Sequence, residues 1–208
     1  MKKKMLGFLT SLILSFSILA TPFSEGHQYL QLRRPSSSEL QVLEFFSFYC
    51  LHCYQFERLY NISSLIKKEL PTGVKLKKYH VDFLGPMGKQ LTQAWAVAML
   101  LNIEDKVSPL LFEELQQKKT IKTLNDIRTI FSKIGISEEE YNLAWNSFSV
   151  KTLVLEQEKM ASDLRVSGVP AVFINEKYMI KNDGLDMSSI DAYIKELVNV
   201  INFLLTLK

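Results

Sequence analysis

A pair of cysteines at the end of an apolar run constrains this fold more than any other feature of the sequence. Residues 41–49 (QVLEFFSFY) are almost continuously apolar or aromatic, which is typical of a central strand buried on both faces. The motif CLHC follows at once, at residues 50–53, and apolar residues then recur at helical spacing up to Leu70. The sequence therefore predicts a strand-to-helix corner that carries both cysteines, followed by one helix over 50–70.

Beyond this corner the pattern changes from strand to helix and back to strand. Pro71-Thr72-Gly73 ends the first helix, and alternation over 74–83 predicts a second strand. Two further short strands and a last helix close the chain, whereas residues 21–40 predict no regular structure. The remaining predicted elements are helices at 89–101, 106–117, 124–134, from 138 and over 150–164, strands at 171–174 and 178–180, and a helix over 187–205.

This order predicts an α/β fold in which an all-helical segment interrupts one sheet. Strands on both sides of the helical block have the apolar character of sheet strands, so we expect them to pair in a single sheet. The expected division is a first part over 21–84, an inserted helical domain over 85–165 and a second part over 166–208. The sequence contains no internal repeat that would suggest another architecture.

The first twenty residues have the pattern of an export signal. Lys2, Lys3 and Lys4 precede an apolar run that ends at Ala20, where we expect cleavage, with an uncleaved anchor as the alternative. Without this segment 22 basic and 22 acidic residues remain, so the mature chain has no basic surface of the kind that nucleic acid requires. We expect export to a compartment where disulfides persist, and the bacterial periplasm fits best.

The spacing of the cysteines predicts redox chemistry. Cys50 would lie at the start of a helix, where unpaired N–H groups and the helix dipole favour a thiolate over a thiol. Cys50 is therefore the expected nucleophile, and Cys53, one turn further on, the expected resolving thiol. His52 in the same turn adds a favourable charge when it is protonated. Stabilising the reduced thiolate form makes the disulfide a stronger oxidant.

Three other uses of the two cysteines fit less well. A zinc site would need further ligands, for which His27 and His80 are the candidates, and no second CxxC is present. A purely structural disulfide would close a very small loop and so constrain the unfolded chain little. A c-type haem site would need histidine where Tyr54 stands. We therefore expect no metal and no other cofactor.

Two more positions are candidates for the site. Pro170 precedes a strand and cannot donate a hydrogen bond, so a cis Val169–Pro170 bond facing the cysteines would leave the Val169 backbone free for an extended substrate. A trans proline at the start of an edge strand is the alternative. Glu44 interrupts the apolar strand, where a buried carboxylate could exchange a proton with Cys53. Alternatively, Glu44 lies at a strand end, partly solvated and paired with Lys78.

The chain resembles the DsbA family of periplasmic thiol:disulfide interchange proteins from about Glu25 to the C-terminal helix. The segments that carry the resemblance are QVLEFFSFYCLHCYQFE, KKYHVDF, GKQLTQAWAVAM, EEYNLAWNSF and SGVPAVFIN. The resemblance implies a thioredoxin-like fold with an inserted helical domain and an enzyme that donates disulfides to newly exported proteins. It also implies reoxidation by a membrane quinone reductase of the DsbB type and an apolar groove for peptides beside the dithiol.

By resemblance, Cys50 is the exposed attacking cysteine, Cys53 its buried partner and His52 the histidine that stabilises the thiolate. Pro170 matches the family's cis-proline, and Glu44 and Lys78 match charged residues beneath the site. One position differs, because Leu51 stands where the family usually has proline. Leucine adds an N–H donor near Cys50 and loosens the turn, and these two effects on the thiolate oppose each other.

Three functions remain open at this point. The first is a monomeric dithiol oxidase whose substrates are folding exported proteins with free cysteines. The second is a reductase or isomerase of the same compartment, although isomerases usually need a dimerisation module that this chain lacks. The third is a peptide-binding chaperone in which the cysteines are incidental.

Overall fold

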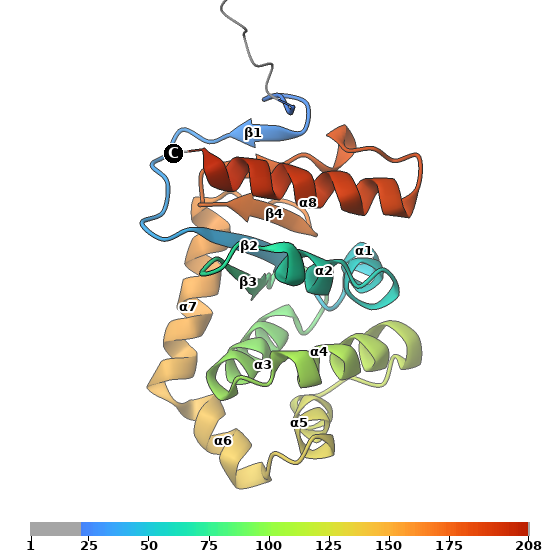
Figure 1. The fold of residues 1–208 in the computed structure, drawn as a ribbon. Helices are drawn as coiled ribbons and strands as arrows, with labels where there is room; N and C mark the ends of the chain where they lie inside the picture. Colours follow the sequence, from blue (N-terminus) through green and yellow to red (C-terminus); the bar gives the residue numbers. More distant parts are fainter. Residues whose placement is uncertain (1–21, 208) are drawn as a thin grey trace, which may run out of the picture.

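A five-stranded mixed sheet is the centre of this computed structural model, which describes residues 22–207 (Figure 1). The strand order is β1-β5-β4-β2-β3, and β2 runs parallel to β3 and antiparallel to β4. β2 lies between β4 and β3, and every residue of it is buried, as its apolar sequence predicts. The strands are β1 (Tyr29–Gln31), β2 (Gln41–Phe46), β3 (Lys75–His80), β4 (Ala171–Ile174) and β5 (Tyr178–Ile180).

The segment after the cysteines is not the single helix that its periodicity predicts. It divides into α1 (Leu51–Tyr54), a π-helical stretch η1 (Gln55–Leu59) and α2 (Ile62–Glu69). The chain leaves the helical path at Asn61, whose φ of 57° is left-handed, a conformation that asparagine adopts more readily than most residues. Apolar side chains lie on both sides of this break, so the hydrophobic spacing does not reveal it.

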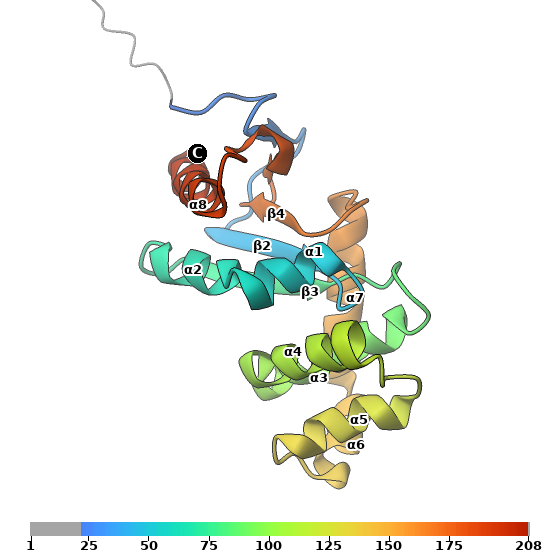
Figure 2. The same ribbon diagram turned by 90° about the vertical axis from the view of Figure 1, so that its right-hand side faces the viewer.

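Helices cover both faces of the sheet (Figures 1 and 2). On one face α2 and α8 (Ile190–Thr206) pack on side chains such as Val42, Val172 and Ile174. On the other face the end of α7 (Phe148–Asp163) packs on Leu43 and Phe173. A short helix, η3 (Asn182–Gly184), joins β5 to the segment before α8.

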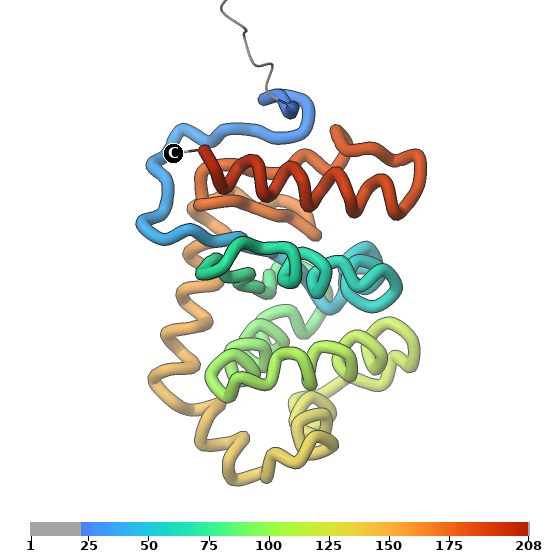
Figure 3. Tube along the Cα trace, viewed as in Figure 1, coloured from blue at the N-terminus to red at the C-terminus, as the bar shows by residue number. Residues whose placement is uncertain are grey.

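The chain between β3 and β4 is helical, as the sequence predicts for residues 85–165. Its helices lie beyond the β3 edge of the sheet, and α7 then leads the chain back to β4 (Figure 3). They are α3 (Gly88–Leu101), α4 (Glu104–Phe112), a π-helical stretch η2 (Glu113–Lys118), α5 (Leu124–Lys133), α6 (Glu138–Asn146) and α7. Among residues 22–207 no helix combines the length and apolar character needed to cross a membrane.

Aromatic side chains join this helical insert to the sheet. Phe46 at the end of β2 packs edge-on against Trp95 of α3, with ring centroids 5.0 Å apart. Phe48, two residues before the first cysteine, packs in the same way on Phe112 of α4 at 4.9 Å. The loop that leads to the cysteines is therefore anchored in a core shared by the sheet and the insert.

Several strand boundaries differ from the prediction. β2 ends at Phe46 rather than Tyr49, because residues 47–49 turn toward the helix, and β3 covers 75–80 rather than 74–83. β1 forms at the sheet edge within a stretch predicted to be irregular. The sequence does not predict this strand because only one of its three residues is buried, so it lacks an apolar pattern. The predicted export signal, residues 1–20, lies outside the described residues.

Candidate active site

Cys50 lies where the loop after β2 turns into α1. It caps this helix, and its Sγ accepts a hydrogen bond from the Cys53 N–H at 3.2 Å. Both cysteines are free thiols in this structure; Cys50 is partly exposed, whereas Cys53 is only 2% exposed. The corner therefore presents one sulfur to solvent and holds the other directly behind it.

The two sulfurs differ in acidity in opposite directions. The pKa of Cys50 is lowered to about 6, chiefly by a side-chain hydrogen bond with Cys53, and further by the backbone N–H groups of Cys53 and His52 and the charge of His52. Burial opposes this shift. The pKa of Cys53 is raised well above that of a free thiol, first by burial and then by its interactions with Cys50. At neutral pH the reduced site thus holds a thiolate on Cys50 and a thiol on Cys53.

Within the motif, His52 and Leu51 are the exposed residues. The Nδ1 of His52 lies 3.2 Å from Oε1 of Gln55, and its contribution to the low pKa of Cys50 is smaller than that of the hydrogen bonds. Leu51 is 57% exposed, with its side chain available to a partner. The backbone N–H groups that lower the pKa of Cys50 most are those of Cys53 and His52.

The Val169–Pro170 segment faces the cysteines from the start of β4. The peptide bond between these residues is cis, which excludes the trans alternative. The carbonyl oxygen of Val169 accepts a hydrogen bond from the Cys50 thiol at 3.2 Å. This hydrogen bond exists only while Cys50 is protonated. The thiolate that predominates at neutral pH has no proton to donate, so there the bond does not occupy the Val169 carbonyl.

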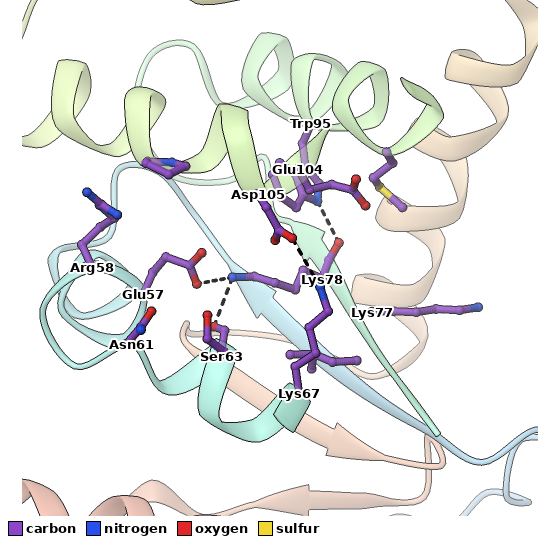
Figure 4. Close-up of a pocket in the computed structure, with 14 residues that line it drawn as sticks. Glu57, Arg58, Asn61, Ser63, Lys67, Lys77, Lys78, Trp95, Glu104 and Asp105 are labelled. Atoms are coloured by element: carbon purple, nitrogen blue, oxygen red, sulfur yellow. Dashed lines mark hydrogen bonds and ion pairs between the residues drawn. The ribbon is translucent and has the colours of Figure 1, made fainter. Parts of the chain in front are cut away.

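A buried ionic layer lies behind Cys53. Glu44 is 2% exposed in the middle of β2, so the alternative of a solvated glutamate at a strand end is wrong. The parallel register places Glu44 opposite Lys78, and the Lys78 Nζ lies 3.3 Å from Glu44 Oε1. Lys78 also bonds to Glu57 at 2.5 Å (Figure 4). Ser63 donates to Glu44 at 2.7 Å. One ammonium group is thus shared by two carboxylates.

The two carboxylates of this layer differ in acidity. Burial raises the pKa of Glu44, and the neighbouring Lys78 only partly reverses this effect. Burial also acts on Glu57, but there Lys78 and hydrogen bonds from Ser63 and Ser108 prevail and lower its pKa. The negative charge of Glu44 further raises the pKa of Cys53, so the protonation of the carboxylate and that of the thiol are electrostatically linked. Of the two acids, Glu44 is the one suited to take up a proton.

Sequence reasoning missed Glu57 and Ser63, because both lie in the segment read as one plain helix. Glu57 follows Cys53 by four residues, one helical turn, and this spacing is the only sequence signal that places it below the dithiol. His80, considered above as a zinc ligand, is buried at the end of β3 and lies in hydrogen-bond contact with Phe48 and Thr92. Within the part of the chain that the structure describes, no three potential metal ligands lie together.

Two hollows flank the helical segment that begins at the cysteines. The first, here called the apolar groove, has a volume of about 560 Å³ and adjoins the site. It is lined by His52, Gln55, Phe56, Tyr60, Ile62, Val169, Pro170, Asn182, Met187, Ser189, Ile190 and Tyr193. The second, the charged cleft, has a volume of about 500 Å³ and is lined chiefly by polar residues of η1, α2, β3 and α4, among them Glu57, Lys67, Lys78 and Asp105 (Figure 4).

Comparison with known proteins agrees with this geometry. Residues 41–193 match the family model of the DSBA-like thioredoxin domain. The thiol:disulfide interchange protein DsbA of Pectobacterium carotovorum subsp. carotovorum is 56% identical over 206 residues, which cover 99% of this chain and 100% of the relative. The chain belongs to the DsbA family. The DsbA of Yersinia pestis is also 56% identical, over 96% of this chain and 97% of its own length.

Solved structures of DsbA proteins show the same fold. The DsbA of Proteus mirabilis superposes with a TM-score of 0.84 at 48% identity, covering 88% of this chain and 97% of the relative. A variant of that protein with a non-covalently bound peptide, PWATCDS, gives a TM-score of 0.85 at 46% identity, covering 89% of this chain and 99% of that one. These matches confirm the predicted thioredoxin-like fold with its helical insertion. The chain is a disulfide oxidoreductase of the DsbA family.

Proposed function

We propose that this protein works as a dithiol oxidase that donates a Cys50–Cys53 disulfide to newly exported proteins. The observation that carries the proposal is the arrangement at Cys50, whose sulfur is partly exposed and has a pKa lowered to about 6. A stable thiolate lowers the free energy of the reduced state, so reduction of the disulfide is favoured. Such a disulfide readily oxidises other thiols. The role is thus a consequence of acidity at one sulfur.

The reaction proceeds through a mixed disulfide. A substrate thiolate attacks Cys50 Sγ, the bond to Cys53 breaks, and Cys53 leaves with the electron pair. A second substrate thiolate then attacks the substrate sulfur of the mixed disulfide, and Cys50 leaves as a thiolate. The substrate loses two electrons and gains a disulfide, while the enzyme becomes a dithiol. A low pKa makes Cys50 a good leaving group in this second step.

The buried layer supplies the proton that Cys53 needs. The pKa of Cys53 is raised, so its departing thiolate takes up a proton, and Glu44 is the acid whose own raised pKa suits it to donate one. Lys78 keeps Glu44 from being an isolated buried charge once that proton has left. In the reverse direction, when the enzyme is reoxidised, Glu44 accepts the proton from Cys53.

Substrates are folding exported proteins with free cysteines, and their chains lie in the apolar groove with their backbone against Val169 and Pro170. A related DsbA from Proteus mirabilis holds a cysteine-containing peptide non-covalently, which supports such a seat here. The enzyme acts as a monomer in the bacterial periplasm after removal of residues 1–20. A DsbB-type membrane quinone reductase, using the same groove, restores the disulfide.

The decisive experiment measures the thiol–disulfide equilibrium of the purified protein in glutathione buffers, together with the folding of a reduced client. An oxidase predicts a disulfide far more oxidising than that of thioredoxin and loss of client oxidation in Cys50→Ser. Cys53→Ser is the matched variant, because it keeps the nucleophile. Its Cys50 attacks oxidised glutathione of the buffer and releases one reduced glutathione; a client thiolate then displaces the second glutathione by attack at Cys50 Sγ, and the resulting Cys50–client mixed disulfide should accumulate because Cys53 cannot resolve it. A potential as reducing as that of thioredoxin would indicate a reductase, and full folding activity in Cys50→Ser would indicate a chaperone.

A further inference from the structure

The loop from β2 to the helix of the cysteines is held at one residue, Phe48, through the peptide groups on either side of it. The Phe48 N–H donates to Nε2 of His80 at 3.2 Å, and the Phe48 carbonyl accepts from Nε2 of Gln116 at 2.7 Å. The Phe48 side chain is completely buried, so this residue is fixed on every side.

These two contacts come from different parts of the chain. His80 ends β3 in the sheet, whereas Gln116 lies on η2 in the helical insert. The position of the loop therefore depends on both parts, and Gln116 gives the insert a direct contact with the backbone that leads to the cysteines. The next residue after Gln116, Gln117, is hydrogen bonded to the hydroxyl of Tyr54 in α1.

The hydrogen bonds around His80 fix its tautomer. The Thr92 hydroxyl donates its proton to the Gly88 carbonyl at 3.1 Å, so it can only accept from Nδ1 of His80, 2.8 Å away. With the ring proton on Nδ1, Nε2 carries the lone pair that accepts the Phe48 N–H. Burial lowers the pKa of His80 to about 3, which keeps the ring neutral and Nε2 an acceptor at physiological pH.

The clamped loop contacts both sulfur-bearing residues. The Cys50 N–H donates to the carbonyl of Ser47 at 3.0 Å, so the loop sets where the nucleophile begins its helix. A backbone hydrogen bond from Ser47 also reaches Cys53 and lowers the pKa of its thiol. A shift of the backbone at Phe48 would therefore change the hydrogen bonding of both cysteines at once.

We propose that Gln116 and His80 are positioning residues of the redox site, which hold the two peptide groups that flank Phe48 and so fix Cys50 relative to Cys53. The inference rests on the proposed role of Cys50 as the attacking cysteine. It assigns to the helical insert a part in setting the reduction potential, through one amide side chain.

The test compares Gln116→Met with Gln93→Met. Gln93 also lies in the insert and its Nε2 also donates to a backbone carbonyl, that of Trp145 at 3.0 Å, remote from the cysteines. Each substitution removes one amide-to-carbonyl hydrogen bond at nearly constant side-chain volume. We expect Gln116→Met to raise the Cys50 pKa and to make the disulfide less oxidising by about threefold to tenfold, the range that one hydrogen bond contributes. Gln93→Met should leave both quantities unchanged.

His80→Leu is the second variant, and it should shift the glutathione equilibrium in the same direction as Gln116→Met. Equal losses of thermal stability in the two Gln variants, with the equilibrium unchanged in both, would overturn the inference. Measurement of the Cys50 pKa in the unsubstituted protein distinguishes failure of the proposed function from failure of the positioning role. An ordinary pKa for its Cys50 contradicts the proposed function, whereas a low pKa that Gln116→Met does not alter contradicts only the role of the clamp.

Discussion

The apolar groove and the charged cleft lie on opposite sides of one short helical segment. They are similar in volume but differ in the polarity of the residues that line them. His52, Gln55 and Phe56 border the groove, whereas Glu57 and Arg58 border the cleft. The groove exposes side chains that a peptide can cover. The cleft is lined by Lys78 and Glu57, which form an ion pair (Figure 4), and Lys78 also pairs with Glu44. This contrast underlies the proposed roles of the two sides, client binding in the groove and proton transfer by the carboxylates around Lys78.

Removing the central cation should break this contrast most severely. Lys78→Met leaves Glu44 and Glu57 facing each other without their shared ammonium group, inside the protein. We expect a loss of about 3 to 5 kcal/mol in the free energy of unfolding, as for other buried pairs that lose one partner. Urea denaturation measures it, and Lys77→Met, the adjacent residue on β3, is the control with the same charge change. Similar losses in both variants would contradict a central role for Lys78.

Neutralising Glu44 should affect kinetics more than stability. In Glu44→Gln the buried group can no longer carry a proton, so exchange steps that protonate or deprotonate Cys53 should slow by about a hundredfold. Stopped-flow fluorescence over pH 5–8 should show that the pH dependence of this step is lost. Glu176→Gln removes a carboxylate paired with Arg34 at 2.6 Å, far from the cysteines, and should leave the rate unchanged. An unaltered pH profile in Glu44→Gln would exclude the proton transfer.

The pH dependence of Cys50 reactivity tests the lowered pKa of this thiol, which lies at the start of the helical segment between the groove and the cleft. With a pKa of about 6, alkylation of Cys50 by iodoacetamide should fall about tenfold between pH 7 and pH 5. The pKa is lower in the folded protein than its ordinary value of 9.0, so the thiolate stabilises the reduced fold fully above pH 9. That contribution disappears as the pH falls through 6. The oxidised protein, which has no thiol at Cys50, is the control in thermal melts.

The smallest expected effect belongs to the groove. Met187 is 71% exposed at its edge, so Met187→Ser should leave stability almost unchanged but remove apolar area that a peptide would cover. We expect KM for a cysteine-containing peptide to rise about fivefold, with the rate toward a small thiol unaffected. Leu143→Ser, at an exposed apolar residue of α6, is the matched control. Equal effects on peptide and small thiol would place substrate binding elsewhere.

The sequence predicts the corner of the site because its physics is local. An apolar run buried on both faces, two cysteines one turn apart and a proline before a strand each have a characteristic pattern, and the structure brings Cys50, Cys53, Val169 and Pro170 together. The interruption of the apolar strand indicates Glu44, with Lys78 as a possible partner, and family resemblance supports both. The strand register then places them side by side. The same local reasoning gives the helical insert nearly in full.

What the sequence does not predict depends on contacts between distant residues. The break at Asn61 directs α2 so that Ser63 meets Glu44, yet the apolar spacing continues across it. Glu57 is a helical surface residue by pattern and becomes a partner of Lys78 only because α4 packs over it and Ser108 approaches. His80 is read as a possible ligand because the sequence does not show which group its ring nitrogens face.

The order of strands in the sheet has a consequence for biosynthesis. β4 lies between β5 and β2, although it is made long after β2, and Val169 follows Cys53 by 116 residues. A growing polypeptide therefore carries both cysteines through the synthesis of the whole helical block before Val169 can cover them. Until then β2 lacks its neighbour β4, and Cys50 lacks the Val169 carbonyl that faces it. Catalytic competence comes only when the last fifth of the chain has docked.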